Sequence, residues 1–414
     1  MRTYSTDGMN GTDDASAPNG PMGGHAVSND VTTNGGFNGE AVGTLVDERR
    51  LTIEGREVSD DSDCFVIAEI GHNHQGSLKQ AIELFEKAAE CGVDAVKLQK
   101  RHNRSLYTTD YYNRPYDHEN SFGATYGEHR EALEFGKVEY LELQEVAKQL
   151  ELVMMSTAFD IPSADFLAEL DIPAYKIASA DLCNTPLLRH VAEIGKPMIM
   201  STGGHRLEDV RRAYETVAPI NSQIAFLQCT AGYPPEWDEL DLRVIQTYRE
   251  EFPDAVVGFS GHDSGIAMSV ATYVLGGRIV EKHFTLNRAM KGTDHSFSLE
   301  PQGMEKLVRD LERVRIACGD GQKRVYESEA APVTKMAKKL VAARDMPAGH
   351  ILTEEDIAAK SPGDGLPPYE LDRLVGMQLK YPVTEDFALT FEQVESPDDE
   401  RDSEPASVGA REVG

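Results

Sequence analysis

Residues 64–71, CFVIAEIG, and residues 77–91, SLKQAIELFEKAAEC, decide the fold of this chain. The first segment is a continuous apolar, β-branched run of strand length, as expected for a strand that is buried on both faces. The second segment repeats apolar residues such as Ile82 and Phe85 at the spacing of an amphipathic helix. A buried strand followed by such a helix is the repeating unit of a parallel α/β fold.

The same unit recurs along the chain. Eight apolar runs are each followed by a helix-like stretch, and together they cover about 255 residues, which is the count and size of a (β/α)8 TIM barrel. The last helix is expected at Pro301–Cys318, where a proline stands at the first helical position. The expected strands are Cys64–Gly71, Asp94–Lys100, Leu152–Asp160, Ala174–Ala180, Pro197–Gly204, Gln223–Ala231, Ala255–Asp263 and Arg278–Leu286.

The remaining sequence divides into segments around this barrel, which we place at residues 62–318. Residues 1–45 and 395–414 hold few large apolar side chains and are expected to be disordered acidic tails. Residues 319–335 are predicted to be a polar linker, and residues 336–394 a small β-rich domain. A domain of that size is marginal alone, so we expect it to need support from another part of the protein.

One connection within the barrel, residues 101–135, is longer than the others and rich in aromatic and charged residues. Long loops without secondary structure are uncommon in compact domains and are often active-site lids. We therefore expect an irregular lid at this position.

The net charge limits the classes of molecule that the protein is expected to bind. The chain has 414 residues, with 41 Lys+Arg against 70 Asp+Glu and a net charge of −29. Such a surface repels nucleic acid and anionic membranes, so neither is expected as a partner. A small anionic metabolite in a pocket remains compatible, because surface charge is screened. The excess acid favours a halophilic protein kept soluble in high salt, and an ordinary soluble acidic enzyme is the alternative.

The five cysteines show no CxxC spacing, so neither a disulfide framework nor a zinc knuckle is indicated. We expect reduced thiols in a cytoplasmic protein, with no signal peptide and no membrane-spanning run.

Polar and ionisable residues interrupt all eight runs at their carboxyl ends, where TIM barrels carry their active sites, so we predict an enzyme. Lys97 and Lys176, with Lys282 as a third candidate, supply cations. Serine hydroxyls at other strand ends can donate to the oxygens of a phosphate or carboxylate. A salt-bridge role is the alternative for each lysine. The serines are Ser179, Ser201 and Ser260.

Two histidines, His262 and His283, end adjacent strands and could reach one divalent metal ion, although hydrogen-bonded core histidines are the alternative. His72 and His74 follow the first strand and could also be ligands, or simply form a turn. Glu69 needs a partner if it is buried ionised: it either pairs with a lysine or orients or deprotonates a substrate hydroxyl.

Several of these segments resemble the sialic acid synthase (N-acetylneuraminate synthase) family, over about residues 62–394. The C-terminal segment resembles that family's antifreeze-like (SAF) domain, in LVA at 340–342 and GHIL at 349–352. TYGEH at 125–129 and QCT at 228–230 are most similar to the animal-type branch, whose substrate is a 6-phosphorylated aminosugar. The barrel motifs are FVIAEIG at 65–71, DAVKLQ at 94–99, YKIAS at 175–179, GFSGH at 258–262, EKHF at 281–284 and KGTDH at 291–295.

The resemblance implies condensation of phosphoenolpyruvate with N-acetylmannosamine or its 6-phosphate, giving a nonulosonic acid and inorganic phosphate. It implies that phosphoenolpyruvate binds Lys97, Lys176, Ser179, Ser201 and Ser260. It further implies that His262 and His283 hold Mn or Mg, and that Glu69, His283 and Asp294 are catalytic. The other positions that match contacts to the sugar or to the metal's waters are Gln99, Thr157, Asp181 and Tyr233.

Three residues depart from the family's pattern. Asp181 stands where bacterial members have Glu, and Ala231 replaces an Asn or Ser. Ser361 stands where many bacterial members have an Arg that reaches the partner subunit's sugar in a domain-swapped homodimer. The alternatives are the same chemistry on another acetamido sugar, giving a legionaminic-type product, a metal-dependent aldolase using free pyruvate, and a non-catalytic sugar-binding module.

Overall fold

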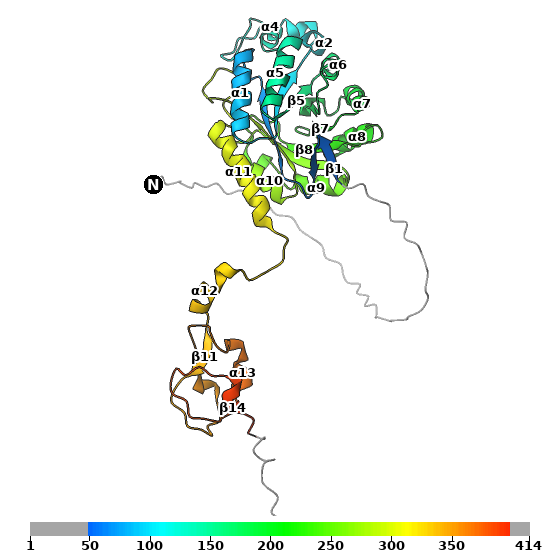
Figure 1. The fold of residues 1–414 in the computed structure, drawn as a ribbon. Helices are drawn as coiled ribbons and strands as arrows, with labels where there is room; N and C mark the ends of the chain where they lie inside the picture. The colour runs from blue at the N-terminus through cyan, green and yellow to red at the C-terminus, as the bar shows by residue number, and fades with distance from the viewer. Residues whose placement is uncertain (1–48, 398–414) are drawn as a thin grey trace, which may run out of the picture. The chain divides into compact units, whose positions relative to one another are not determined.

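The computed structural model describes residues 49–397, so the expected tail at 1–45 and nearly all of the one at 395–414 lie outside it. Eight parallel strands close into a barrel in the order β10-β3-β4-β5-β6-β7-β8-β9, which confirms the TIM barrel (Figure 1). Each strand falls inside one of the eight expected runs. They are β3 Phe65–Gly71, β4 Ala95–Lys100, β5 Val153–Ala158, β6 Tyr175–Ile177, β7 Met198–Ser201, β8 Ile224–Cys229, β9 Val256–Gly261 and β10 Ile279–His283.

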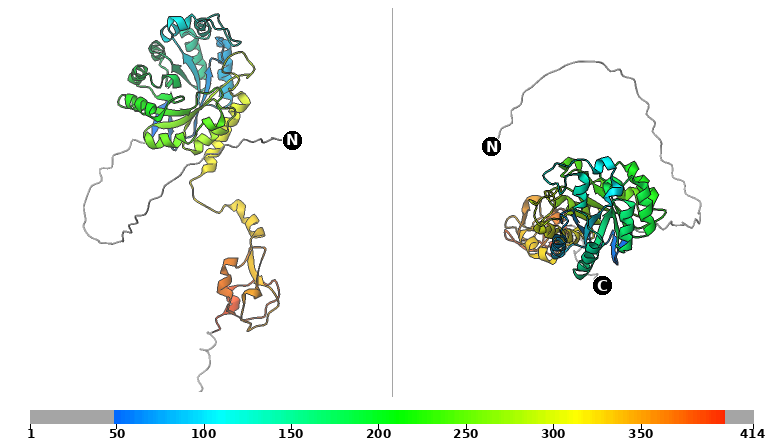
Figure 2. Two further views of the ribbon diagram at one scale, coloured as in Figure 1. Left: turned by 180° about the vertical axis from the view of Figure 1, so that it is seen from behind. Right: turned by 90° about the horizontal axis from the view of Figure 1, so that it is seen from above.

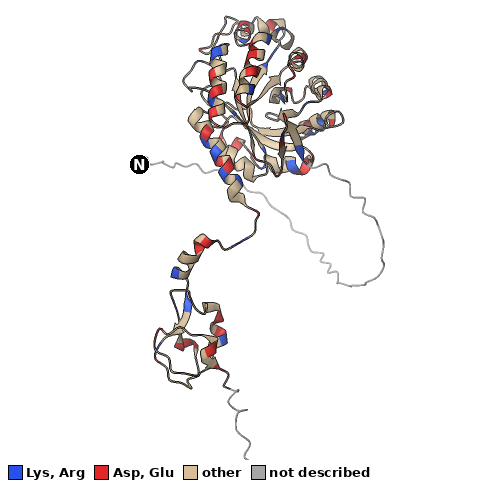
Figure 3. Ribbon diagram, viewed as in Figure 1, with Lys and Arg blue, Asp and Glu red and all other residues tan. Residues whose placement is uncertain are grey.

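Helices surround the strands, as both views of Figure 2 show. Their apolar stripes pack on the outward faces of the strands, where Phe85 and Leu84 of α1 share one core with Val66, Ala68 and Ile70 of β3. The charged residues lie mainly on these helices, whereas the strands are largely free of them (Figure 3). The helices are α1 Leu78–Glu90, α5 Lys137–Gln149, α6 Ile161–Glu169, α7 Thr185–Ile194, α8 Leu207–Val217, α9 Val244–Glu251, α10 Ala267–Val274 and α11 Pro301–Cys318.

Alternation along each strand sends every second residue into the barrel. Because Val66, Ala68 and Ile70 of β3 face the helices, Glu69 faces inward. The register then places Glu69 beside Lys97 of β4 and His283 of β10. The strand periodicity therefore brings ionisable side chains from three strands to one level of the interior.

A hairpin that the sequence analysis did not predict precedes the barrel. Its strands, β1 Arg50–Ile53 and β2 Arg56–Ser59, pair antiparallel. Leu51, Ile53 and Val58 are buried in one cluster with the inward-facing residues near the start of the barrel strands. Each such side chain contributes about 1.5–3 kcal/mol on burial. The hairpin therefore packs against the amino-terminal end of the barrel.

The segment 101–135 is not the irregular loop that we expected, because it contains three short helices. These are α2 Asn103–Leu106, α3 Thr109–Tyr112 and α4 Tyr126–Glu131. The last begins with a capping box in which Thr125 Oγ1 accepts from the Glu128 amide and Glu128 Oε2 accepts from the Thr125 amide, both at 3.2 Å. Two otherwise unpaired N–H groups are satisfied in this way, which explains part of the TYGEH motif.

The segment expected as a polar linker, residues 319–335, contains most of α12, Glu327–Met336, with Pro332 inside the helix. Beyond it, a small β-rich fold has its own core of leucines, among them Leu340, Leu374 and Leu389. Among residues 49–397, no helix is long and apolar enough to cross a membrane. The remaining elements are β11 Lys339–Ala342, β12 Ile357–Lys360, α13 Leu371–Leu374, β13 Gln378–Leu379, β14 Val394–Glu395 and the 3-10 turns η1 Ser179–Asp181, η2 Trp237–Glu239, η3 Glu354–Asp356, η4 Pro368–Glu370 and η5 Phe391–Gln393.

The carboxylate of Asp356 is fully buried in this small fold and gathers several donors. It accepts from Arg344 Nη2 at 2.6 Å, from His350 Nε2 at 2.8 Å and from the Thr353 amide at 2.9 Å. Burial acts to raise the pKa of Asp356, but these hydrogen bonds outweigh it and hold that pKa far below its usual range. The carboxylate is therefore a structural centre of the small fold.

Candidate active site

A cavity of about 580 Å³ opens at the carboxyl ends of the barrel strands. This volume is within the range of small-molecule sites. Asp181, a predicted contact to the sugar, does not line it, and its carboxylate accepts from Asn184 Nδ2 at 3.1 Å. The predicted residues that do line it are Glu69, Lys97, Gln99, Thr157, Lys176, Ser179, Ser201, Tyr233, Ser260, His262, His283 and Asp294.

Lys97 lies deep in this cavity, with 2% of its surface exposed. Its Nζ is 2.7 Å from Glu69 Oε2 and donates to Thr157 Oγ1 at 3.0 Å. Burial raises the pKa of Glu69, and the nearby carboxylate of Glu281 adds to this, although Lys97 opposes both. The ion pair that the sequence left open is thus present, and Glu69 holds a proton more readily than an exposed carboxylate does.

A second buried lysine, Lys176, donates from Nζ to Ser201 Oγ at 2.6 Å. Between the two lysines lies Glu281, whose Oε1 is 3.7 Å from Lys97 Nζ and 3.9 Å from Lys176 Nζ. Ser260 Oγ donates to the same oxygen at 3.1 Å. Burial acts to raise the pKa of Glu281, but Lys176 and Lys97 outweigh it and lower that pKa. Glu281 was not among the predicted site residues, although its spacing of two residues from inward-facing His283 implies an inward side chain.

The third lysine candidate, Lys282, is not part of this set, so that expectation was wrong. Its Nζ pairs with Asp263 Oδ1 at 2.9 Å, both side chains are buried, and neither lines the cavity. Alternation gives the reason, because the residues on either side of Lys282 face inward.

On the same side of the cavity as Lys176, where the adjacent strands β6 and β7 end, the Gly203 amide donates to Ser179 Oγ at 2.9 Å. A Cβ at Gly203 would lie 3.0 Å from that oxygen and 3.1 Å from the Ala231 amide nitrogen. Glycine is therefore required for the close approach of these backbone and hydroxyl groups, which add donors beside Lys176.

His262 and His283 face each other, with ring centroids 5.4 Å apart. His262 Nδ1 donates to the Thr230 carbonyl at 3.0 Å, which leaves the lone pair on Nε2. Burial, together with His283, lowers the pKa of His262 to about 4. The buried Nδ1 of His283 has no hydrogen-bond partner and lies 3.9 Å from Asp294 Oδ2. Two neutral imidazoles with a carboxylate nearby fit a divalent metal.

The loop histidines have other surroundings. His74 stacks on Phe135, with centroids 4.1 Å apart, and its Nδ1 accepts from the Gly76 amide at 3.0 Å. It is a buried turn residue, as one of the two alternatives held. His72 lines the cavity beside Arg101 and Arg130, which the sequence analysis did not select. No local motif marks these arginines. Arg101 follows β4 and Arg130 lies in α4, so the two meet only in the folded chain.

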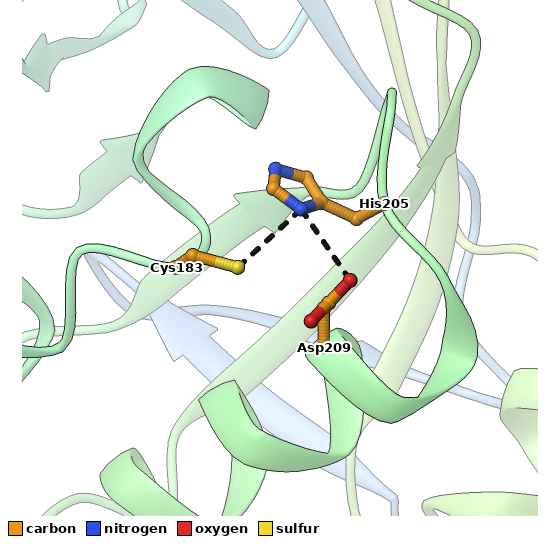
Figure 4. Close-up of side chains that lie close together, drawn as sticks. All are labelled: Cys183, His205 and Asp209. Atoms are coloured by element: carbon orange, nitrogen blue, oxygen red, sulfur yellow. Dashed lines mark hydrogen bonds and ion pairs between the residues drawn. The ribbon is translucent and has the colours of Figure 1, made fainter.

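A separate trio lies outside the cavity, where Cys183 Sγ is 3.4 Å and Asp209 Oδ2 is 3.9 Å from His205 Nδ1 (Figure 4). Across residues 49–397 it is the one group of three potential metal ligands within 4.8 Å of one another. His205 Nε2 donates to the Ser179 carbonyl at 2.8 Å, so this trio supports the backbone of Ser179 from behind.

Comparisons with known proteins agree with this geometry. A model of the NeuB family matches residues 84–323, and a model of the SAF domain matches residues 339–395. Human N-acetylneuraminate-9-phosphate synthase is 39% identical over 343 residues, which cover 83% of this chain and 96% of that protein. N,N'-diacetyllegionaminic acid synthase of Legionella pneumophila is 33% identical and covers 80% of this chain and 95% of that protein.

Among solved structures, N-acetylneuraminic acid synthetase from Leptospira borgpetersenii, in complex with citrate, superposes with a TM-score of 0.61 at 29% identity. The match covers 69% of this chain and 95% of that chain.

Proposed function

The chain belongs to the NeuB family, and from this membership we propose that it condenses phosphoenolpyruvate with N-acetylmannosamine or the 6-phosphate of that sugar. Water is consumed, and the products are N-acetylneuraminate or its 9-phosphate and inorganic phosphate. The observation that carries the proposal is the pair of buried lysines, Lys97 and Lys176, at the bottom of a cavity that also holds two neutral imidazoles.

The reaction forms one carbon–carbon bond and one carbon–oxygen bond to water, and it breaks the carbon–oxygen bond to phosphate. C3 of the enol attacks the aldehyde carbon of the open-chain sugar, and the aldehyde oxygen takes up a proton. Water then adds to the cationic C2, and the tetrahedral intermediate releases phosphate as its C2–O bond breaks. The protein therefore has to bind a polyanion, hold the aldehyde close to C3, and manage two protons.

The lysines and serine hydroxyls bind the phosphate and carboxylate of phosphoenolpyruvate. In the substrate-free cavity, Glu69 and Glu281 neutralise Lys97 and Lys176. When the substrate anion binds, the raised pKa of Glu69 favours proton uptake at this carboxyl group, which leaves Lys97 to the ligand. Glu69 then orients a hydroxyl of the acceptor and can exchange a proton with it.

We place the divalent metal, Mn2+ or Mg2+, at His262 and His283, with Asp294 holding its waters or a sugar hydroxyl. The unpartnered Nδ1 of His283 and the orientation of His262 support this position. When bound, the ion would polarise the aldehyde carbonyl. The Tyr233 ring contacts the His262 ring, with centroids 4.2 Å apart and the planes tilted by 38°, and it closes one side of the acceptor space.

The test incubates the protein with Mn2+, phosphoenolpyruvate and one of the two acceptors, and measures inorganic phosphate and the nine-carbon product. Lys176→Met should abolish turnover, whereas Lys196→Met should leave it intact, since Lys196 pairs with Asp171 at the surface. Phosphate release with a diacetamido sugar alone would instead indicate a legionaminic-type product. Release with no acceptor sugar would contradict the proposal.

We also propose that the protein is a homodimer in which the SAF domain covers the partner's barrel. The small size of that domain supports this, as do its exposed apolar side chains Ile351, Tyr369, Tyr381 and Phe387. The Ser361 hydroxyl accepts from Lys338 Nζ at 2.6 Å, so this position makes a local contact. Sedimentation velocity, together with complementation between a barrel variant and a SAF-deleted chain, tests this arrangement.

We place the protein in a reducing cytoplasm at high salt. The five cysteines are all free thiols, and the net charge of −29 is typical of a surface adapted to screened repulsion. Equal activity and stability in dilute buffer and in molar KCl would contradict the second part.

A further inference from the structure

Two guanidinium groups on the cavity wall have no ion-pair partner among the described residues, although the carboxylates of Glu134 and Asp294 act on them from farther away. Among residues 49–397, no carboxylate lies within ion-pair distance of Arg101 or Arg130, although both line the cavity and Arg101 is only 7% exposed. Arg101 Nη2 donates to Gln99 Oε1 at 2.7 Å, and its guanidinium lies 3.6 Å from the centre of the Phe159 ring. Buried arginines are normally paired with acids, because an unpaired buried charge is costly.

His72 lies between the two arginines but does not supply the negative charge that would pair with them. Arg101 Nη1 approaches His72 Nε2 at 3.0 Å, and Arg130 Nη1 approaches His72 Nδ1 at 3.2 Å. Burial, followed by Arg101 and Arg130, lowers the pKa of His72 well below its ordinary value, so the ring is neutral. A neutral imidazole has one lone-pair nitrogen, so one of the two contacts sets N–H against N–H. The cluster therefore has more donors than acceptors.

The nearest acid, Glu134, is already engaged. Its Oε2 accepts from Lys100 Nζ at 3.0 Å and from the Arg101 amide at 3.2 Å, while its Oε1 is 4.0 Å from His72 Nε2. Glu134 thus forms its ion pair with Lys100 and acts on the Arg101 guanidinium only from farther away. Arg130 donates its other N–H groups to Tyr126 Oη, at 3.0 Å from Nε and 2.8 Å from Nη2, which is a neutral acceptor.

From this geometry we infer that Arg101, Arg130 and His72 form an anion subsite that binds a phosphate monoester on the acceptor sugar. The inference rests on the proposed condensation and deepens it. An anion beside His72 that accepts from both guanidinium groups would supply the missing acceptors and an ion-pair partner for each arginine. The three residues come from the β3–α1 loop, the end of β4 and α4, so the segment expected as a lid contributes one wall of the subsite.

The numbering of the product's carbon atoms shows which end of the acceptor sugar carries the phosphate. Phosphoenolpyruvate supplies C1–C3 of the product, so C9 of an N-acetylneuraminate 9-phosphate is C6 of the acceptor. This is the end of the sugar chain farthest from the aldehyde. In the protein, Gln99 and Glu69 likewise separate the two arginines from Lys97. Gln99 Oε1 accepts from Arg101, and Gln99 Nε2 donates to Glu69 Oε1 at 2.6 Å. Glu69 in turn pairs with Lys97, beside which the aldehyde and the enol would react.

The test compares N-acetylmannosamine with its 6-phosphate in the wild type, in Arg130→Met, in Arg130→Lys and in Arg114→Met. Arg114 is an exposed arginine of the same segment that does not line the cavity, so its variant is the matched control. We expect wild-type kcat/KM to be at least about 10-fold higher for the phosphorylated sugar. Arg130→Met should lower that value about 30-fold and change the value for the free sugar by less than about 3-fold. Arg130→Lys should retain part of the preference.

Calorimetric binding of the two sugars to the same four proteins gives a readout that does not need turnover. An Arg130-dependent preference for the 6-phosphate in binding supports the subsite even if no acceptor turns over, a result that would defeat the proposed reaction alone. Equal use of both sugars by the wild type, or an equal loss with both in Arg130→Met, overturns the subsite and leaves the condensation standing. A rise confined to KM for phosphoenolpyruvate in Arg130→Met would also overturn it, because the anion bound there would then be the other substrate.

Discussion

Replacing Lys97 by Met should destabilise the barrel strongly, and the loss should depend on pH. The substitution removes the ammonium that lies 2.7 Å from Glu69 and 3.7 Å from Glu281, and leaves two carboxylates in a cavity where both are buried. Removing one partner of a buried ion pair costs about 3–5 kcal/mol, so we expect the free energy of unfolding to fall by about 4 kcal/mol near pH 8.

The sign of the pH dependence follows from Glu69. Its pKa is already raised by burial in the wild type, and loss of Lys97 removes the main opposing charge and raises it further. A carboxyl group whose pKa is higher in the folded than in the unfolded state contributes stability below its unfolded pKa, about 4.3, and loses it as pH rises through the folded pKa. The deficit of Lys97→Met relative to the wild type should therefore shrink between pH 8 and pH 5.

Urea unfolding at both pH values, followed by circular dichroism, measures this deficit. Lys97→Met with Glu69→Gln should recover part of the loss, since the second change removes the uncompensated charge. Lys137→Met is the control, because Lys137 pairs with Glu169 at the surface, and it should change stability by less than about 0.5 kcal/mol. A loss that is equal at both pH values and simply additive with Glu69→Gln would refute the electrostatic argument.

Three further outcomes are expected. Gly71→Ala should lower kcat about 100-fold in a folded protein, because Gly71 has φ +53° and a Cβ there would lie 3.2 Å from Glu69 Oε1; unchanged kinetics would contradict this. Asp356→Ala should lower the unfolding free energy of the SAF domain by about 3 kcal/mol, measured by urea unfolding of the full chain. In the wild type the contribution of Asp356, whose pKa is depressed, should be present above about pH 4 and decline as pH falls further. Chelation should abolish phosphate release, and added Mn2+ or Mg2+ should restore it in the wild type but not in His262→Ala.

The strands of the barrel could be predicted because both of their faces are buried, so β-branched apolar runs mark them clearly. The site residues on them followed from position at the strand ends. Parity along the strand was the unused signal: it places Glu281 and His283 inward and Lys282 outward, as the structure shows. The β1–β2 hairpin was missed because each of its strands has four residues, too few to show a period.

Arg101 and Arg130 illustrate a different limit. Their charges are ordinary in the sequence, and what distinguishes them is the absence of a carboxylate partner in the described part of the fold. Such an absence arises from packing between segments that are distant along the chain. The Thr125–Glu128 capping box, by contrast, is a local pattern that could have indicated a helix inside the expected lid.

The hairpin at the amino-terminal end of the barrel affects the order in which substrates bind and products are released. Because Leu51, Ile53 and Val58 fill that end, substrates and products use the opposite end of the barrel, where Tyr233 is 59% exposed. Lys97 and Lys176 lie far inside, with exposures of 2% and 3%. A sugar seated under Tyr233 would then lie between the mouth of the cavity and the two lysines. Phosphoenolpyruvate would have to enter first and inorganic phosphate leave last, so steady-state kinetics should be sequential and ordered, with phosphate competing against phosphoenolpyruvate.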